Sequence, residues 1–199
     1  MNAIAIVLAA GRGLRMGGPK ALMELNGVPW WRLQRERLAE AGVPSIWVVS
    51  EMVAKAMQGA QALPSRLVLA DSSKPMFESL LTGLRALGED PPDGVFVLPV
   101  DVPASRDPKV WEELAASKQP AAPAIQGRSG HPVFLPGAWV KGTLWPRVAG
   151  GEGPVRLDEL IGGGLIQVPT CDPDVLCNLN TPEDLRLFLS AARATFDTR

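Results

Sequence analysis

The most constraining feature of the sequence is an apolar run that leads directly into a glycine-rich loop, I-A-I-V-L-A-A-G-R-G-L-R-M-G-G-P-K at residues 4–20. The unbroken apolar run, Ile4–Leu8, is typical of a strand that is buried on both faces, as in parallel sheets. The loop combines four glycines with the positive charges of Arg12, Arg15 and Lys20. Backbone N–H groups and fixed positive charge are suited to binding phosphate. The stretch therefore predicts a central strand followed by a phosphate-binding loop.

The rest of the chain alternates predicted strands with predicted helices. Apolar runs predict strands at 4–8, 45–50, 66–70, 94–99, 121–126, 132–135 and 165–169. Helical periodicity and helix-end signals predict helices at 28–41, 52–61, 75–87, 108–117 and 181–196. Glycine and proline interrupt the stretch 136–164, which predicts an irregular lobe with short helices. The alternation predicts a three-layer α/β/α fold with a mainly parallel, Rossmann-like sheet.

Length, charge and histidine content limit the possible functions. The 199 residues suffice for one well-filled core, so a single domain over 1–199 is expected. The formal net charge of -1, without any dense Lys/Arg run, argues against nucleic-acid or membrane-surface partners. The N-terminal apolar run is too short to span a bilayer and lacks the basic start of a signal peptide, so a cytoplasmic protein is expected. His131 is the only histidine, which excludes a multi-histidine metal site, and Cys171 and Cys177 have no partners at zinc spacing.

Two common nucleotide-binding loops do not fit the glycine-rich stretch. The dinucleotide fingerprint G-x-G-x-x-G would start at Gly11, but Met16 stands where the third glycine belongs. The P-loop G-x-x-x-x-G-K-[ST] would start at Gly13, but Pro19 separates its second glycine from Lys20, and alanine replaces its hydroxyl residue. The loop is therefore expected to hold phosphate in another way.

The segment L-A-A-G-R-G-L-R-M-G-G-P-K at 8–20 resembles the signature of the GT-A-like nucleotidyltransferases, L-A-[AG]-G-x-[SG]-x-R-M-G-x-x-K. Within that group it looks most like the molybdopterin nucleotidyltransferases. Further matches follow in the family's order, namely L-P-V-D-V-P at 98–103, G-H-P-V at 130–133 and N-L-N-T-P-E-D-L at 178–185. The resemblance implies a GT-A-type fold with a nucleotide-binding half at about 1–105 and, with the irregular lobe, an acceptor-binding half at about 106–199.

The resemblance also implies the reaction, which is nucleotidyl transfer. The phosphate of a molybdopterin-type acceptor attacks the α-phosphorus of a nucleoside triphosphate, and pyrophosphate leaves. This nucleophile is ionised near neutral pH, so the reaction needs positioning and charge neutralisation but no general base. Arg15, Lys20 and Asp101 are the expected catalytic residues. The expected nucleotide-binding residues are Leu8, Ala9, Ala10, Gly11, Arg12, Gly13, Lys20 and Asp71.

Mg²⁺ is the expected cofactor, and Asp101, which follows an apolar strand, is its expected ligand. The resemblance places a second ligand in the C-terminal motif, where Asn180 is the candidate. Asn178 and Asn180 could each bind the acceptor or stabilise the loop instead. The expected acceptor-binding residues are His131, Arg156, Asn178 and Asn180. The segment around Arg156 departs from the family pattern, because Glu152 replaces an aspartate.

The sequence leaves alternatives for the base of the nucleotide donor and for the acceptor. Ala10 and G-H-P-V resemble cytidylyl members of the family, whereas N-L-N-T-P-E-D-L resembles guanylyl members, and the balance favours CTP over GTP. A sugar-phosphate nucleotidylyltransferase is the alternative enzyme, although such enzymes are usually longer. An alternative of another class is a non-catalytic protein that binds a nucleotide or carries the molybdenum cofactor. A molybdoenzyme that receives the cofactor is an expected partner beside the triphosphate and the acceptor.

Overall fold

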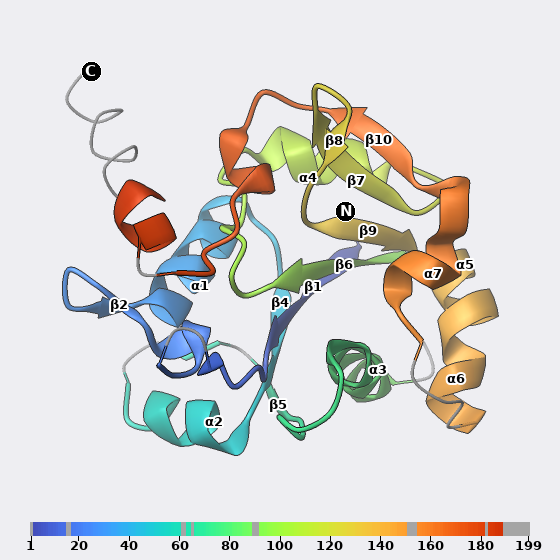
Figure 1. Ribbon diagram of the computed structural model, residues 1–199. Coiled ribbons are helices and arrows are strands. Elements are labelled where there is room, and N and C mark those ends of the chain that lie inside the picture. Colours follow the sequence, from blue (N-terminus) through green and yellow to red (C-terminus); the bar gives the residue numbers. More distant parts are fainter. Residues whose placement is uncertain are drawn as a thin grey trace.

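An eight-stranded sheet crosses the molecule, and helices cover both of its faces (Figure 1). The structure is a computed structural model that describes residues 2–14, 17–60, 63–64, 66–88, 92–150, 155–181 and 183–188. The strands of the sheet are β1 (Ala3–Ala9), β4 (Ser45–Val49), β5 (Leu67–Leu69), β6 (Gly94–Pro99), β7 (Ala121–Ile125), β8 (Arg128–Ser129), β9 (Val133–Pro136) and β10 (Ile166–Pro169). A separate two-stranded hairpin pairs β2 (Glu24–Leu25) with β3 (Val28–Pro29).

The strand order places β1 at the centre of the sheet. The order is β10-β7-β9-β6-β1-β4-β5, with β8 beside β7. β1 is parallel to both neighbours, β4 and β6, whereas β9 is antiparallel to β6 and β7, so the predicted, mainly parallel sheet is confirmed. The chain moves outward from β1 to β4 and β5, then returns across the sheet to β6 on the other side of β1. Such a reversal leaves a crevice at the carboxyl ends of the strands.

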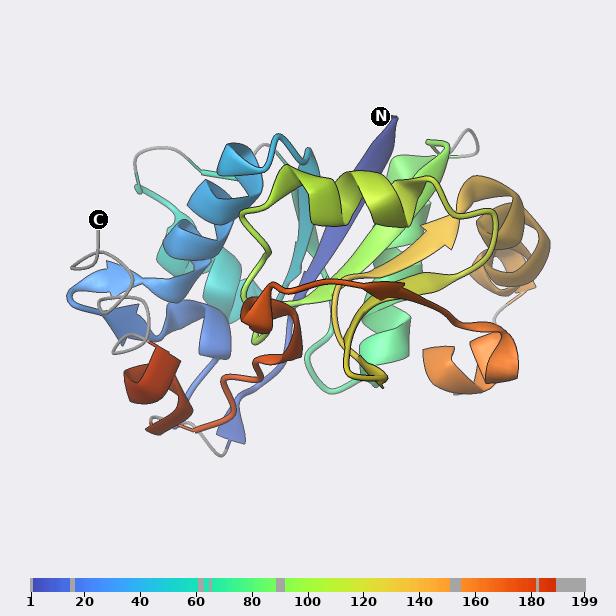
Figure 2. The same ribbon diagram turned by 90° about the horizontal axis from the view of Figure 1, so that it is seen from above.

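Two hydrophobic cores lie on the two faces of the sheet. The helices are α1 (Trp30–Glu40), α2 (Glu51–Met57), α3 (Met76–Leu87), α4 (Pro108–Ala115), α5 (Gly137–Trp139), α6 (Trp145–Gly150) and α7 (Leu157–Ile161). Side chains of α1, α2 and α4 fill one core, whereas those of α3 and of the helical stretch after β9 fill the other (Figures 1 and 2). β1 serves both cores, because Ala5 and Val7 point into the first and Ile6 and Leu8 into the second. The predicted three-layer α/β/α architecture is therefore confirmed.

The helix α3 lies unusually close to the central strands. A Cβ atom on Gly83 would lie 2.7 Å from Ile6 Cγ2 and 3.0 Å from Val48 Cγ2, so only glycine allows this approach without a shift. The close packing fixes the N-terminal end of α3 beside the crevice between β1 and β6. The sequence predicted a helix at 75–87, but not its distance from the sheet.

The described part of the stretch 136–164 forms short helices, as the sequence predicted. A π-helical segment, η3 (Val140–Leu144), joins α5 to α6, and a short 3₁₀ helix, η4 (Gly162–Gly164), follows α7. Trp139 and Trp145 are half-buried against the core beneath α3. Packing of these rings against the second core helps to hold α5 and α6 in place.

The C-terminal segment returns from β10 to the N-terminal elements. It passes through the 3₁₀ helix η5 (Pro173–Leu176) and reaches helical residues 183–188 beside α1 (Figures 1 and 2). Thr181 caps this helix, because its Oγ1 accepts a 3.1 Å hydrogen bond from the Asp184 N–H. The Asp184 carboxylate accepts one of 2.8 Å from the Thr181 N–H in return. The rest of the predicted helix, from 189, lies outside the described residues. Within the described ranges, no helix combines the length and apolar character needed to cross a membrane.

Candidate active site

Three side chains from distant parts of the sequence meet at the carboxyl edge of the sheet. The Lys20 ammonium donates hydrogen bonds of 2.6 Å to Asp101 Oδ2 and 2.6 Å to Asn180 Oδ1. Lys20 begins the 3₁₀ helix η2 (Lys20–Leu22) after the glycine-rich loop, Asp101 follows β6, and Asn180 follows η5. The side chains of Lys20 and Asp101 are 20% and 22% exposed, so both groups remain accessible to a ligand. The fold thus unites two expected catalytic residues with the expected second metal ligand.

The glycine-rich loop closes on itself through its backbone. Gly13 has a φ of +60°, and a Cβ on this residue would lie 1.8 Å from the carbonyl oxygen of Gly18. The Gly18 N–H donates a 3.2 Å hydrogen bond to the Gly13 carbonyl. Gly11, by contrast, has nothing within 4 Å of a Cβ position and lies in open space. Arg15, the third expected catalytic residue, lies outside the described residues.

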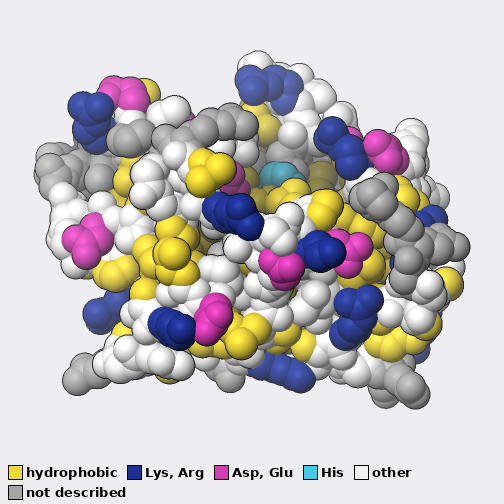
Figure 3. Space-filling model, turned by 60° about the horizontal axis from the view of Figure 1, so that its bottom comes forward, with side chains coloured by type: hydrophobic (Ala, Val, Ile, Leu, Met, Phe, Trp, Pro, Cys, Tyr) yellow, Lys and Arg dark blue, Asp and Glu magenta, His cyan; other side chains and the backbone are white. Residues whose placement is uncertain are grey.

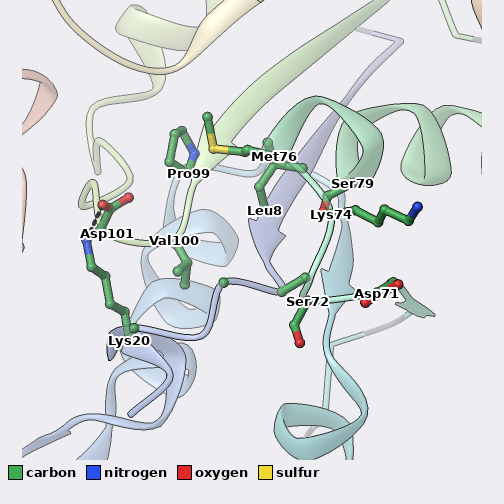
Figure 4. A pocket seen from close by; sticks show the side chains of 13 residues that line it. Leu8, Lys20, Asp71, Ser72, Lys74, Met76, Ser79, Pro99, Val100 and Asp101 are labelled. Atoms are coloured by element: carbon green, nitrogen blue, oxygen red, sulfur yellow. Dashed lines mark hydrogen bonds and ion pairs between the residues drawn. The ribbon is translucent and has the colours of Figure 1, made fainter. Parts of the chain in front are cut away.

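A cavity of about 190 Å³ lies between the loops that follow β1, β5 and β6. Its lining is Leu8, Ala10, Gly11, Gly13, Lys20, Asp71, Ser72, Lys74, Met76, Ser79, Pro99, Val100 and Asp101. Figure 4 shows the Lys20–Asp101 pair at one end of it and Asp71 at the other. A second, wider cavity of about 880 Å³ lies on the outer side of the glycine-rich loop, shares Asp71 and Ser72 with the first, and is also lined by Arg12. Of the expected nucleotide-binding residues, only Ala9 lines neither cavity, because it packs in the first core.

The turn before α3 and the first turn of α3 contribute cavity residues that the motifs did not indicate. Ser72, Lys74 and Met76 line the smaller cavity, and so does Ser79, which is only 5% exposed although it is polar. The sequence did contain a signal for Ser79. The turn after β5 and the helix that follows it were both predicted, and Ser79 lies one turn into that helix, at the edge where ligands bind in such sheets. The resemblance drew attention to Asp71 at the strand end but not to the helix that follows it.

Asp71 is held as an anion by its own turn. Its Oδ1 accepts hydrogen bonds from the backbone N–H of Ser73 at 2.8 Å and from the Ser73 hydroxyl at 2.7 Å. These bonds lower the pKa of Asp71, because they stabilise the charged carboxylate. The remaining oxygen lone pairs can accept hydrogen bonds from a sugar or a base at the junction of the two cavities.

His131 lies beside this site and packs against the segment that leads to Asn180. Its backbone N–H donates a 2.9 Å hydrogen bond to the Val175 carbonyl, and a Cβ on Gly130 would lie 2.1 Å from the same oxygen. Burial lowers the pKa of the imidazole, and the negative charge of Asp101 opposes that shift. Nδ1 is buried without a hydrogen-bond partner among the described residues. Figure 3 shows the histidine, in cyan, recessed in a hollow of this face.

Two of the expected acceptor-binding residues have other partners. Arg156 is exposed, and its guanidinium donates two hydrogen bonds of 3.0 Å to the carboxylate of Asp158 at the start of α7. These contacts raise the pKa of Arg156. The Asn178 amide donates a 3.4 Å hydrogen bond to the Leu176 carbonyl. Neither residue lines a cavity with Lys20, so Asn180 is the asparagine that the fold brings to Asp101.

Comparisons with known proteins identify the family of the chain. Residues 5–161 match the model of the MobA-like NTP transferase domain. A molybdenum cofactor guanylyltransferase from Rhodobacter capsulatus is 30% identical over 93% of this chain and 94% of its own length. A nucleotidyl transferase structure from Methanothermobacter superposes with a TM-score of 0.74 at 25% identity over 97% of this chain and 99% of that one. The structure of molybdopterin-guanine dinucleotide biosynthesis protein A from Archaeoglobus fulgidus, at 16% identity over 93% of this chain and 95% of that one, has the same fold with a TM-score of 0.66. The chain therefore belongs to the MobA-like NTP transferase family, which confirms the resemblance and the enzyme class expected from the sequence.

Proposed function

We propose that the protein transfers GMP from GTP to the phosphate of molybdopterin and releases pyrophosphate. The observation that carries the proposal is the meeting of Lys20, Asp101 and Asn180 at the end of a cavity that the glycine-rich loop also lines. The names of the full-length relatives supply the donor and the acceptor.

The residues present suit a reaction that depends on charge neutralisation. The phosphate nucleophile carries its own negative charge, so no residue needs to remove a proton. Lys20 and the backbone N–H groups of the glycine-rich loop supply positive charge where the α-phosphate and the leaving pyrophosphate gather negative charge. Arg15 is assigned the same role on the basis of the motif. Asp71 and Arg12 lie farther along the two cavities, where the nucleoside and the rest of the triphosphate would bind.

The donor set at the site fits Mg²⁺. Asp101 Oδ2 and Asn180 Oδ1 already converge on one cation, the Lys20 ammonium, and both are oxygen ligands of the kind that Mg²⁺ prefers. The described residues contain no group of three or more acidic, histidine or cysteine side chains that could hold a metal, so phosphate oxygens and water would complete the shell. When bound, Mg²⁺ would neutralise charge on the triphosphate. Asp101 and Asn180 would hold the ion, and the Lys20 ammonium would then be free of Asp101 and able to reach a phosphate.

The choice of GTP rests on the relatives, because the sequence motifs favour CTP. Ala10 lines the smaller cavity, where a change at this position would alter the space available to the nucleotide. Pyrophosphate release should therefore be measured with ATP, GTP, CTP and UTP, each with Mg²⁺ and molybdopterin. Release with GTP alone is the expected result. Release with CTP alone would replace GTP by CTP in the proposal and restore the expectation from Ala10.

The same assay separates the alternative functions. Pyrophosphate release with sugar phosphates, but not with molybdopterin, would identify a sugar-phosphate nucleotidylyltransferase. Nucleotide binding without pyrophosphate release for any acceptor would indicate a carrier that passes a bound cofactor to a molybdoenzyme. The contact between Lys20 and the expected metal ligand favours the enzyme, because a carrier that only binds the nucleotide has no need for a metal site.

A further inference from the structure

One buried face of α1 carries polar groups, although the core-facing side of a helix is normally apolar. Trp30, Gln34 and Arg37 follow one another at helical spacing and are 1%, 0% and 6% exposed. Their polar groups are directed toward the loop at 100–104, which contains Asp101. The catalytic assignments above use neither Gln34 nor Arg37.

Hydrogen bonds from this face flank Asp101 on both sides. The Trp30 indole N–H donates a 2.5 Å hydrogen bond to the Val100 carbonyl. The Gln34 amide donates one of 2.6 Å to the Val102 carbonyl, and its oxygen accepts one of 2.8 Å from the Ala104 N–H. The loop therefore owes its conformation to side chains about seventy residues away and not only to its own sequence.

Arg37 joins this loop to the C-terminal segment. Its Nε donates a 2.6 Å hydrogen bond to the Ala104 carbonyl, and its terminal amino group pairs with the Asp174 carboxylate. The guanidinium also lies 5.5 Å from the centre of the Phe188 ring, which packs edge-on against Trp30. One buried cation thus contacts the chain before and after Asn180. The two segments meet directly as well, because the Leu179 N–H donates a 2.8 Å hydrogen bond to the Asp101 carbonyl.

We propose that Gln34 and Arg37 are positioning residues that set the distance between Asp101 and Asn180. Gln34 fixes the loop that carries Asp101, and Arg37 ties that loop to the segment that carries Asn180. A buried ion pair contributes little net stability compared with apolar residues of similar volume, so stability alone does not account for Arg37 here. The kinetic part of this inference rests on the proposed function, whereas the structural part does not.

The structural part is tested by amide hydrogen exchange on the folded protein without ligands. Arg37→Met should raise the exchange rates of the Ala104 and Leu179 amides by about ten- to a hundredfold, because a buried charge-assisted contact is lost. Amides in β1 and α3 should keep their wild-type rates. Arg32→Met is the matched control, since Arg32 lies on the same helix in an exposed pair with Glu36, and its exchange pattern should match the wild type. Unchanged exchange at Ala104 and Leu179 in Arg37→Met would overturn the proposal.

The kinetic part is tested by a double-mutant cycle with the four proteins wild type, Arg37→Met, Asn180→Ala and the double variant. If Arg37 acts by placing Asn180, Asn180→Ala should lower kcat strongly in the wild type but only slightly in the Arg37→Met background. Arg37→Lys should restore part of the loss, because lysine keeps the charge but cannot bond Ala104 and Asp174 together. If Asn180→Ala lowered kcat by the same factor in the wild type and in Arg37→Met, Arg37 would have a purely structural role. That result would overturn the inference.

A second variant covers the case in which Arg37→Met does not fold. Asp174→Asn removes the negative charge of the Arg37–Asp174 pair. The exchange rate of the Leu179 amide should therefore rise, as in Arg37→Met. Its kcat should fall while the apparent KM for the triphosphate changes little, because the nucleotide-binding loops stay intact. If the wild type itself releases no pyrophosphate with any substrate, the proposed function fails, and the exchange pattern still decides whether Gln34 and Arg37 hold the two segments together.

Discussion

The two loops that meet at Lys20 and Asp101 are held in place by opposite means. The glycine-rich loop after β1 depends on backbone geometry, since Gly13 adopts a φ of +60° and touches Gly18. The loop after β6 depends on side chains of another element, since Gln34 and Arg37 bond its carbonyls at Val102 and Ala104. A loop of the first kind presents backbone N–H groups that can bind phosphate. A loop of the second kind holds one carboxylate at a fixed position.

The comparison predicts the largest effect where the two loops meet. Lys20→Ala removes the ammonium that contacts Asp101 and that would stabilise charge on the phosphates. Turnover should fall by about a hundred- to a thousandfold, as for the loss of one preorganised transition-state donor. Steady-state kinetics with the exposed Lys118→Ala as a control measures this. A change confined to the apparent affinity for the triphosphate would make Lys20 a ground-state binder.

The loop held by side chains should be sensitive to a change far from it in sequence. Gln34→Leu keeps the volume of the buried side chain but leaves the Ala104 N–H and the Val102 carbonyl without a partner. The free energy of unfolding should fall by about 2–3 kcal/mol, since each orphaned buried group carries a desolvation cost. Urea denaturation of Gln34→Leu measures this change. The control variant Arg32→Met should have the wild-type free energy of unfolding. Equal stability of both variants would show that the loop after β6 does not need Gln34.

The glycine-rich loop should be destabilised by substitution only where the backbone conformation requires glycine. Gly13→Ala forces a residue with a Cβ into the left-handed region and into contact with Gly18, so it should lower the free energy of unfolding by about 2 kcal/mol. Gly11→Ala should lower it far less, because a Cβ there meets open space. Thermal and urea unfolding of the two variants side by side test this, and equal losses would contradict the role given to Gly13.

The smallest predicted effect concerns the metal. If Asp101 and Asn180 hold the metal, as proposed above, Lys20 would compete with a divalent cation for both side chains in the absence of nucleotide. Lys20→Met should therefore strengthen Mn²⁺ binding to the free protein by about two- to fivefold, the range expected for an accessible charge pair. Titration followed by the electron paramagnetic resonance of Mn²⁺ measures this without any activity assay. Asp101→Asn should weaken the same binding, and an unchanged affinity in both variants would place the metal elsewhere.

The difference between the loops also explains what the sequence could predict. Glycines and the lysine that follows them form a local motif, so the first loop and the strand before it were visible in the sequence. Asp101 was visible for a similar reason, because it directly follows a fully apolar strand. Asn180 was placed near it only by resemblance, and the structure supplies the contact through Lys20.

The residues that support the site could not be predicted in the same way. Gln34 and Arg37 interrupt an apolar helix face, which is a local signal. Their partners, the loop at 100–104 and Asp174, are far away in the sequence and cannot be identified from it. Ser79 lacked a motif, and its position in the cavity depends on how closely α3 approaches β1 through Gly83. Contacts of this kind arise from packing between elements, which periodicity alone does not specify.

The most direct test of the account is transfer of label from GTP, marked at its α-phosphate, to molybdopterin in a single turnover with Mg²⁺. The wild type should give labelled product and one pyrophosphate for each transfer. Asp101→Asn, in which the carboxylate is replaced by an amide of the same shape, should slow the transfer by about a hundredfold or more. Transfer at the wild-type rate by Asp101→Asn, or binding of GTP by the wild type without any labelled product, would contradict the assignment of this site.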